Sequence, residues 1–167
     1  MTKIKVPIRY LPTLNKTKDM QKQVKMLMKS RKQYKKGNFF TRKKLDSYTS
    51  KPSTHVKDAQ KIYNIKNVAP NNELVKKTGC SLSALKQIVR KGEGAYYSSG
   101  SRPNQTPQSW GLARLASSIT AGKSAAVDYD ILEKGCDHKK KAFILAKKSK
   151  KKYKFGQSKT RKTTVIV

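Results

Sequence analysis

The chain has 167 residues, enough for one ordinary domain and short for two. Apolar residues make up 35% of the sequence, which predicts a core formed by part of the chain. Lysine and arginine number 40 against nine acidic residues, a formal charge of +31. Self-repulsion on this scale opposes a compact isolated monomer and favours a polyanionic or acidic protein partner. The charge balance therefore argues against a free-standing metabolic enzyme.

The charge is unevenly distributed along the chain. Residues 1–70 carry 19 lysines and arginines against three acids, residues 71–137 carry nine against six, and residues 138–167 carry 12 and no acid. This pattern predicts a compact helical middle domain over 71–137. We expect the basic N-terminal arm, 1–70, and the Lys-rich C-terminal segment, 138–167, to be extended and to take their order from partners.

The two cysteines, Cys80 and Cys136, are too few for a disulfide framework. A single bridge between them stays open, although free thiols of a reducing compartment are the default. The first ten residues lack the apolar segment of a secretory signal, and no apolar run approaches the roughly 20 residues of a bilayer span. We therefore expect a protein made and kept in a reducing compartment.

In the N-terminal arm, residues 1–15 contain two prolines and no period, which predicts extended chain. Residues 17–34 have helical periodicity with a thin apolar stripe, and Gly37 follows as a stop signal. An irregular basic and aromatic stretch comes next. A second short helix is predicted at about 54–63, just after Pro52.

The middle domain has clearer punctuation. Short helices are predicted over 73–78 and 82–91, each ended by a glycine, followed by a loop over 92–108. Thr106 and Pro107 open a further helix that ends at Gly122 and carries Trp110 on its apolar face. Helices over 126–134 and 139–148 come next, and 163–167 is a candidate strand that could add to another sheet edge. The fold class is mainly α.

Residues 73–92 have the spacing of a helix-turn-helix, with Val75, Gly79, Leu85 and Ile88 at the packing positions. Three cations would lie on or beside the outer face of the second helix, where they could contact phosphates: Lys86, Arg90 and Lys91. A helical hairpin packed into a small domain has the same spacing. Recognition of DNA by this hairpin is therefore the alternative interpretation.

We find no pattern that predicts an enzyme. The AGKS segment at 121–124 lacks the glycine that a phosphate-binding loop requires, because Ser117 stands there. The cysteines and histidines lack the close spacing of zinc ligands. We therefore expect no catalytic residue, cofactor, metal or small-molecule substrate. The basic tail, KKSKKKYKFGQSKTRK, fits nucleic acid, an anionic membrane surface or an acidic protein surface equally well.

The stretch GAYYSSGSRPNQTPQSWGLARLASSITAGK, residues 94–123, resembles a family of small basic virion proteins of nucleocytoplasmic large DNA viruses. Upstream, RKQYKKGNFFTRKKLDSY and SKPSTH share this resemblance. It implies a structural minor capsid protein, made in the infected cell and lying on the inner side of an icosahedral shell. Its partners would be the major capsid protein and other minor capsid proteins, with viral DNA or an anionic inner membrane surface as further candidates. The alternative is a DNA-binding virion protein that uses the basic tail and the hairpin.

The two arms carry scattered aromatic and apolar side chains, which could anchor such a protein on capsomers. The candidate contact residues are Tyr10, Met20, Val24, Leu27, Tyr34, Phe39, Phe40, Tyr48 and Tyr63. In the middle domain we expect Trp110 to be core near Tyr96 and Tyr97, and Arg102 and Arg114 to pin the long loop.

Overall fold

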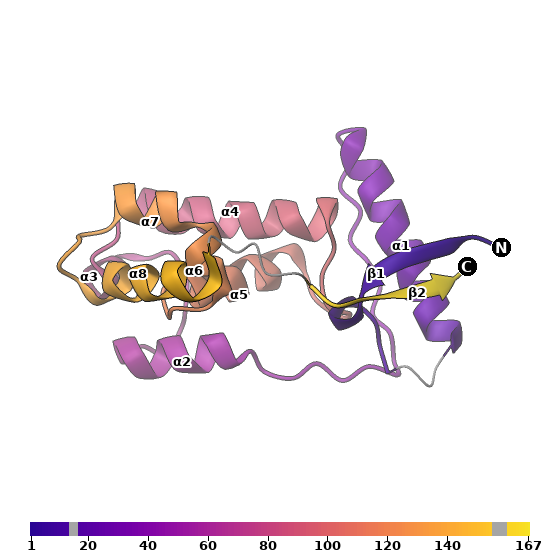
Figure 1. Ribbon diagram of the computed structural model, residues 1–167, viewed down its shortest axis with the longest axis horizontal. Helices are drawn as coiled ribbons and strands as arrows, with labels where there is room; N and C mark the ends of the chain where they lie inside the picture. Colours follow the sequence, from indigo (N-terminus) through magenta and orange to yellow (C-terminus); the bar gives the residue numbers. More distant parts are fainter. Residues whose placement is uncertain (14–16, 155–159) are drawn as a thin grey trace. The chain divides into compact units, whose positions relative to one another are not determined.

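The computed structural model describes residues 1–13, 17–154 and 160–167. Within these ranges it contains eight α-helices, one short 3-10 helix and a two-stranded sheet (Figure 1). The predicted mainly α class is confirmed. Residues 155–159 of the predicted basic tail lie outside the described residues.

The chain forms two compact units that do not follow the predicted boundaries. Unit 1 comprises Met1–Lys51, Glu93–Trp110 and Lys159–Val167, and unit 2 comprises Pro52–Gly92 and Gly111–Ser158. Each unit carries 20 lysines and arginines, against three acids in unit 1 and six in unit 2, so the net charges are +17 and +14. The neutral middle and basic arms of the sequence therefore do not correspond to separate folded parts.

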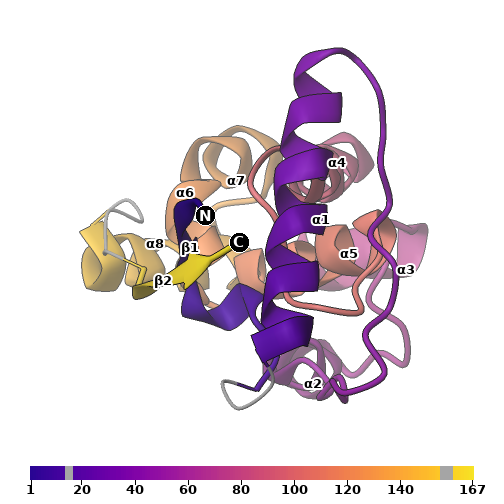
Figure 2. The same cartoon turned by 90° about the vertical axis from the view of Figure 1, so that its right-hand side faces the viewer.

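Both chain ends of unit 1 join in one small sheet. Strand β1, Lys3–Pro7, pairs antiparallel with β2, Lys162–Ile166, and Ile4 lies opposite Val165. Figure 2 shows the two strands side by side, with the N- and C-termini at the same end. The predicted C-terminal strand is therefore present, but its partner is the start of the same chain.

The sheet and the 3-10 helix, Ile8–Tyr10, share a core with helix α1, Thr17–Lys35. The buried residues of this core are Val6, Tyr10, Leu11, Val24, Leu27 and Val165, with Ile4, Met20, Trp110 and Val167 packed against them. Tyr10, Val24 and Leu27, proposed from the sequence as partner contacts, are thus intramolecular. The thin stripe of α1 is covered by segments distant in sequence, so the N-terminal arm does not need a partner to bury it.

Unit 2 is helical. It contains α2, α3, α6, α7 and α8 (Thr54–Tyr63, Asn72–Thr78, Lys123–Val127, Tyr129–Gly135 and Lys141–Tyr153). Two further helices, α4, Leu82–Ser98, and α5, Pro107–Ser118, belong to unit 2 over most of their length. The last residues of α4 and the first residues of α5 belong to unit 1. The largest fully buried side chains include Leu74, Leu85, Ile88, Leu115, Ile119, Leu132 and Phe143.

Most predicted helix ends are close to the observed ones, and the cap predicted at Thr106 is formed. The cap predicted at Asp137 is not, because α8 begins after Lys140 with no side-chain cap, and α3 is capped by Asn71 and not by Asn72. The Thr106 hydroxyl accepts from the Ser109 N–H at 3.0 Å, and the Ser109 hydroxyl accepts from the Thr106 N–H at 2.9 Å. Gly79 ends α3 with φ +75°, a backbone conformation that favours glycine. The predicted helix over 126–134 is instead two helices, α6 and α7, separated at Asp128.

Gly92 does not stop a helix, contrary to expectation. Helix α4 continues to Ser98, so the predicted loop over 92–108 shortens to 99–106. A Cβ on Gly92 would lie 2.6 Å from the Gly111 Cα of α5. The glycine therefore permits a close approach of two helix backbones. Close packing of helices and the end of a helix both favour glycine, so the residue alone does not distinguish them.

We predict that Gly92→Ala lowers the free energy of unfolding by about 2 kcal/mol, because the new methyl group forces α4 and α5 apart. Gly94→Ala is the matched control in the same helix, where a Cβ would meet only the Tyr34 hydroxyl at 3.6 Å. The control should raise stability by about 0.5–1 kcal/mol. Urea denaturation measures both changes, and equal effects of the two substitutions would contradict the close contact.

Cys80 and Cys136 form a disulfide, so the default of free thiols does not hold in this structure. Backbone hydrogen bonds flank it, from the Ser81 N–H to the Gly135 carbonyl at 2.7 Å and from the Asp137 N–H to the Gly79 carbonyl at 2.8 Å. The bridge connects the turn between α3 and α4 to the end of α7. The two cysteines are 56 positions apart in the sequence.

We expect the double variant Cys80→Ser with Cys136→Ser to lose about 2–4 kcal/mol of stability, since the crosslink limits the entropy of the unfolded chain. Thermal unfolding with and without reductant tests this. Reductant should lower the Tm of the native chain and leave that of the double variant unchanged. A native Tm insensitive to complete reduction would contradict a stabilising role.

Candidate functional site

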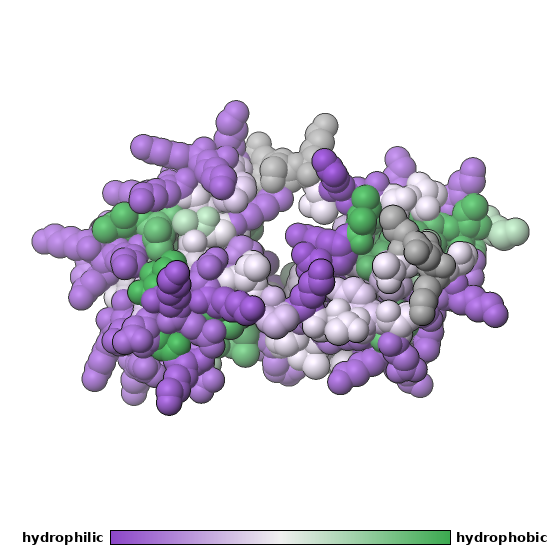
Figure 3. Space-filling model, turned by 90° about the horizontal axis from the view of Figure 1, so that it is seen from below, coloured by the Kyte–Doolittle hydropathy of each residue, from purple (hydrophilic) through white to green (hydrophobic). Residues whose placement is uncertain are grey.

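Aromatic side chains gather on the surface of unit 1. The aromatic patch consists of Tyr34 from α1, Phe39 from the segment after it, and Tyr97 from α4. The rings of Tyr34 and Tyr97 are nearly parallel, with centroids 5.9 Å apart, and the Phe39 ring lies 5.1 Å from Tyr97. Phe39 is 71% exposed. The side of the molecule shown in Figure 3 is mostly hydrophilic, with hydrophobic patches between the hydrophilic side chains.

Cations lie next to this patch. The Lys29 Nζ is 4.5 Å from the centroid of the half-buried Phe40 ring. Lys32, Lys35 and Lys36 are exposed on and just after the last turn of α1. The patch therefore combines exposed aromatic faces with positive charge, a combination suited to an acidic surface that also offers apolar contacts.

A buried arginine fixes the segment that presents Phe39. Arg42 donates hydrogen bonds from its guanidinium to Ser30 Oγ at 3.0 Å, the Tyr96 carbonyl at 2.9 Å and Ser101 Oγ at 2.8 Å. Its guanidinium carbon lies 3.8 Å from the centroid of the Tyr96 ring. Burial lowers the pKa of Arg42, and the neighbouring Tyr96 partly opposes that shift. The irregular segment after α1 is thus tied to α1, α4 and the following loop.

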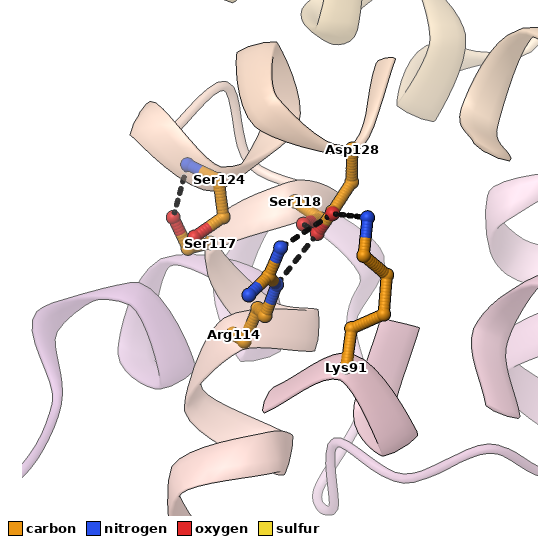
Figure 4. A network of polar contacts seen from close by, with 6 residues as sticks. All are labelled: Lys91, Arg114, Ser117, Ser118, Ser124 and Asp128. Atoms are coloured by element: carbon orange, nitrogen blue, oxygen red, sulfur yellow. Dashed lines mark hydrogen bonds and ion pairs between the residues drawn. The ribbon is translucent and has the colours of Figure 1, made fainter. Parts of the chain in front are cut away.

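Unit 2 holds a buried carboxylate, Asp128, between α6 and α7 (Figure 4). Arg114 donates two hydrogen bonds to it, from Nε at 2.9 Å and from Nη2 at 2.7 Å. The Ser118 hydroxyl donates at 3.0 Å, and the Lys91 Nζ lies 3.4 Å away. Both oxygens are engaged, so the carboxylate is placed to join α4, α5 and α7 and not to accept a substrate proton.

Asp128→Asn should lower the free energy of unfolding by about 3 kcal/mol, because Arg114 loses its charged partner in a mostly buried site. The control is Asp130→Asn, an exposed residue in the first turn of α7, which should change stability by less than about 0.5 kcal/mol. Guanidinium denaturation measures the difference. An Asp128→Asn protein as stable as the control would contradict the structural role.

The predicted phosphate contacts lie on the surface, and one of them forms an ion pair within unit 2. Lys86 and Arg90 are exposed on α4, while Lys91 is paired with Asp128. The predicted packing of the hairpin is confirmed, since Leu85 and Ile88 are fully buried. The AGKS segment forms a hydrogen bond within unit 2 and does not present a phosphate-binding loop. The Ser124 N–H donates to Ser117 Oγ at 3.3 Å.

The predicted loop and core residues are partly redistributed. Trp110 is half-buried and meets Tyr10 edge-to-face at 6.3 Å, so its aromatic neighbour is not Tyr96 or Tyr97. Arg102 is exposed, and Arg114 bonds Asp128 and not the loop. These two arginines therefore do not pin the loop as expected.

Asn104 fixes that loop instead. Its side chain accepts from the Leu45 N–H at 2.7 Å and donates to the Leu45 and Tyr48 carbonyls at 3.1 and 2.7 Å. Tyr48, a candidate contact residue, is half-buried beside it. Asn104 has a φ of +61°. Its partners are distant in the sequence, so the residues next to Asn104 do not indicate these contacts.

Tyr63, another candidate contact residue, lies in the core of unit 2. Its hydroxyl donates to the Ile119 carbonyl at 2.5 Å. Burial raises the pKa of Tyr63 well above its usual value. It is therefore a packing residue and not a partner contact.

The raised pKa of Tyr63 makes the folded state lose stability above about pH 10, where the tyrosine of the unfolded chain ionises and the buried one does not. Below that pH the contribution is complete. Tyr63→Phe cannot ionise, so its stability should fall less steeply between about pH 9 and 11. Denaturation at several alkaline pH values measures the two slopes, and identical slopes would contradict selective ionisation of Tyr63.

In the described part of the chain, no group of three or more His, Cys, Asp or Glu side chains is arranged to hold a metal ion. Among the same residues, no helix has the length and apolar character needed to cross a membrane.

Comparison with known proteins matches most of the chain to a family model. The model of a family of unknown function, DUF5824, matches residues 7–140, which include most of both units. The chain belongs to this family. No curated protein matches the chain, and no solved structure matches it either.

Proposed function

We propose that this chain is a structural, non-enzymatic protein of a large double-stranded DNA virus particle. Its role is that of a minor capsid protein on the inner side of the shell, where it cements major-capsid capsomers. The observation that carries the proposal is the aromatic patch of unit 1, in which Tyr34 and Phe39 are exposed and Tyr97 is half-buried, on a strongly cationic surface.

Three properties of the patch support a protein partner. Aromatic side chains contribute much of the energy of protein interfaces, and Phe39 is mostly uncovered. Arg42 holds the segment in place before binding, which reduces the entropy lost on association. The surrounding lysines favour an acidic partner surface. The resemblance of residues 94–123 to virion proteins supplies the viral context.

A DNA-binding virion protein is the second candidate. The observation that favours it is the exposure of Lys86 and Arg90 on the second helix of the packed hairpin. Any protein of this charge binds DNA, so affinity alone does not distinguish the candidates. Sequence preference that is lost in Lys86→Ala with Arg90→Ala would favour DNA recognition.

The proposal predicts that disrupted particles leave the protein with the shell fraction, and that Phe39→Ala with Tyr34→Ala lowers its incorporation severalfold. Ile8→Ala is the control, because Ile8 is another exposed apolar residue of unit 1 outside the patch. Quantitative mass spectrometry of shell and nucleoprotein fractions measures both. Recovery with DNA and release by nuclease would overturn the capsid role.

A further inference from the structure

Helix α8 borders a pocket in unit 2 that none of the preceding roles uses. The cavity has a volume of about 660 Å³. Its lining, called here the lysine pocket, consists of Tyr129, Ile144 and five lysines: Lys147, Lys148, Lys150, Lys151 and Lys154. Helix α8 packs on α6 and α7, and α7 contributes Tyr129 (Figure 1).

The charge of the lysine pocket has one sign. No acidic side chain is among the described residues that line it. The Lys150 Nζ lies 4.2 Å from the centroid of the Tyr129 ring. Lys148 and Lys151, one helical turn apart on α8, are exposed, as is Lys154. Glu133 hydrogen-bonds the Tyr129 side chain, and Asp130 also lies near it, so two carboxylates border the pocket on the α7 side. An anion in the pocket would nevertheless meet several ammonium groups on the α8 side.

The lining is also largely apolar. Ile144 is 45% exposed, although it lies on a helix whose other apolar residues, such as Ala142, Phe143 and Ala146, are buried. Lysine side chains add their methylene stems to such a surface and keep their charges at its edge. A ligand that fits the pocket thus needs an apolar part as well as negative charge.

These two requirements distinguish an anionic phospholipid from a nucleic acid as the ligand. A nucleic-acid backbone neutralises lysines but gains little from contact with an isoleucine side chain. An anionic phospholipid offers a phosphate headgroup to the ammonium groups and an acyl segment to Ile144 and the lysine stems. We propose that the lysine pocket binds an anionic phospholipid at a bilayer surface. This inference goes beyond the proposed function and does not depend on it.

The experiment is co-sedimentation of the full chain with phosphatidylcholine vesicles, with and without phosphatidylserine. Binding is expected on the phosphatidylserine vesicles. The pocket variant Lys148→Gln, Lys151→Gln, Lys154→Gln should bind them at least tenfold more weakly than the control variant Lys57→Gln, Lys76→Gln, Lys77→Gln. Both variants remove three exposed lysines from unit 2, so they carry the same net charge. Equal losses would overturn the pocket.

A second variant separates lipid from nucleic acid without changing charge. Ile144→Ser should weaken binding to phosphatidylserine vesicles about tenfold and leave binding to a DNA duplex unchanged. Val127→Ser is the control, because Val127 is 47% exposed in the same unit and does not line the pocket. If Ile144→Ser binds the vesicles like Val127→Ser, or if the pocket lysines matter equally for DNA, the site recognises phosphate alone and the lipid assignment is wrong.

Discussion

Forty cationic side chains repel one another throughout this chain, and the fold must keep nearly all of them in water. In the described residues no lysine is buried, and Arg42 is the one buried cation. Arg42 is compensated by neutral oxygens and an aromatic face, and buried Asp128 is compensated by Arg114. Apolar side chains are consequently divided between two small cores, and most of the positive charge remains available for binding.

Local patterns determined much of the helical structure. The stripe of α1 and the boundaries of α2 follow from periodicity and a preceding proline, and the Thr106 cap follows from its side-chain oxygen. These signals act within one or two turns, so a single sequence contains them in full. The cationic hairpin face and the exposed aromatic residues Tyr34 and Phe39 were predictable for the same reason.

Features formed between distant segments were not predictable. Gly92 has the same identity whether it ends a helix or lets α4 approach Gly111, and Tyr10 looks the same whether a partner or Trp110 covers it. Arg42 is one of many basic residues in its region, and its role depends on Tyr96 and Ser101, more than 50 residues away. A lysine-rich helix likewise gives no sign that its stems line a cavity with Tyr129.

The antiparallel pairing of β1 with β2 also determines when unit 1 can form during synthesis. Strand β1 is translated before all of unit 2, whereas its partner, Lys162–Ile166, follows unit 2 in the sequence. Domains whose segments are contiguous fold as they emerge, whereas unit 1 must wait until β2 has also left the ribosome. Until then Val24 and Leu27 on α1 lack the complete sheet that covers them. The nascent chain therefore exposes apolar side chains of α1 that the folded protein buries.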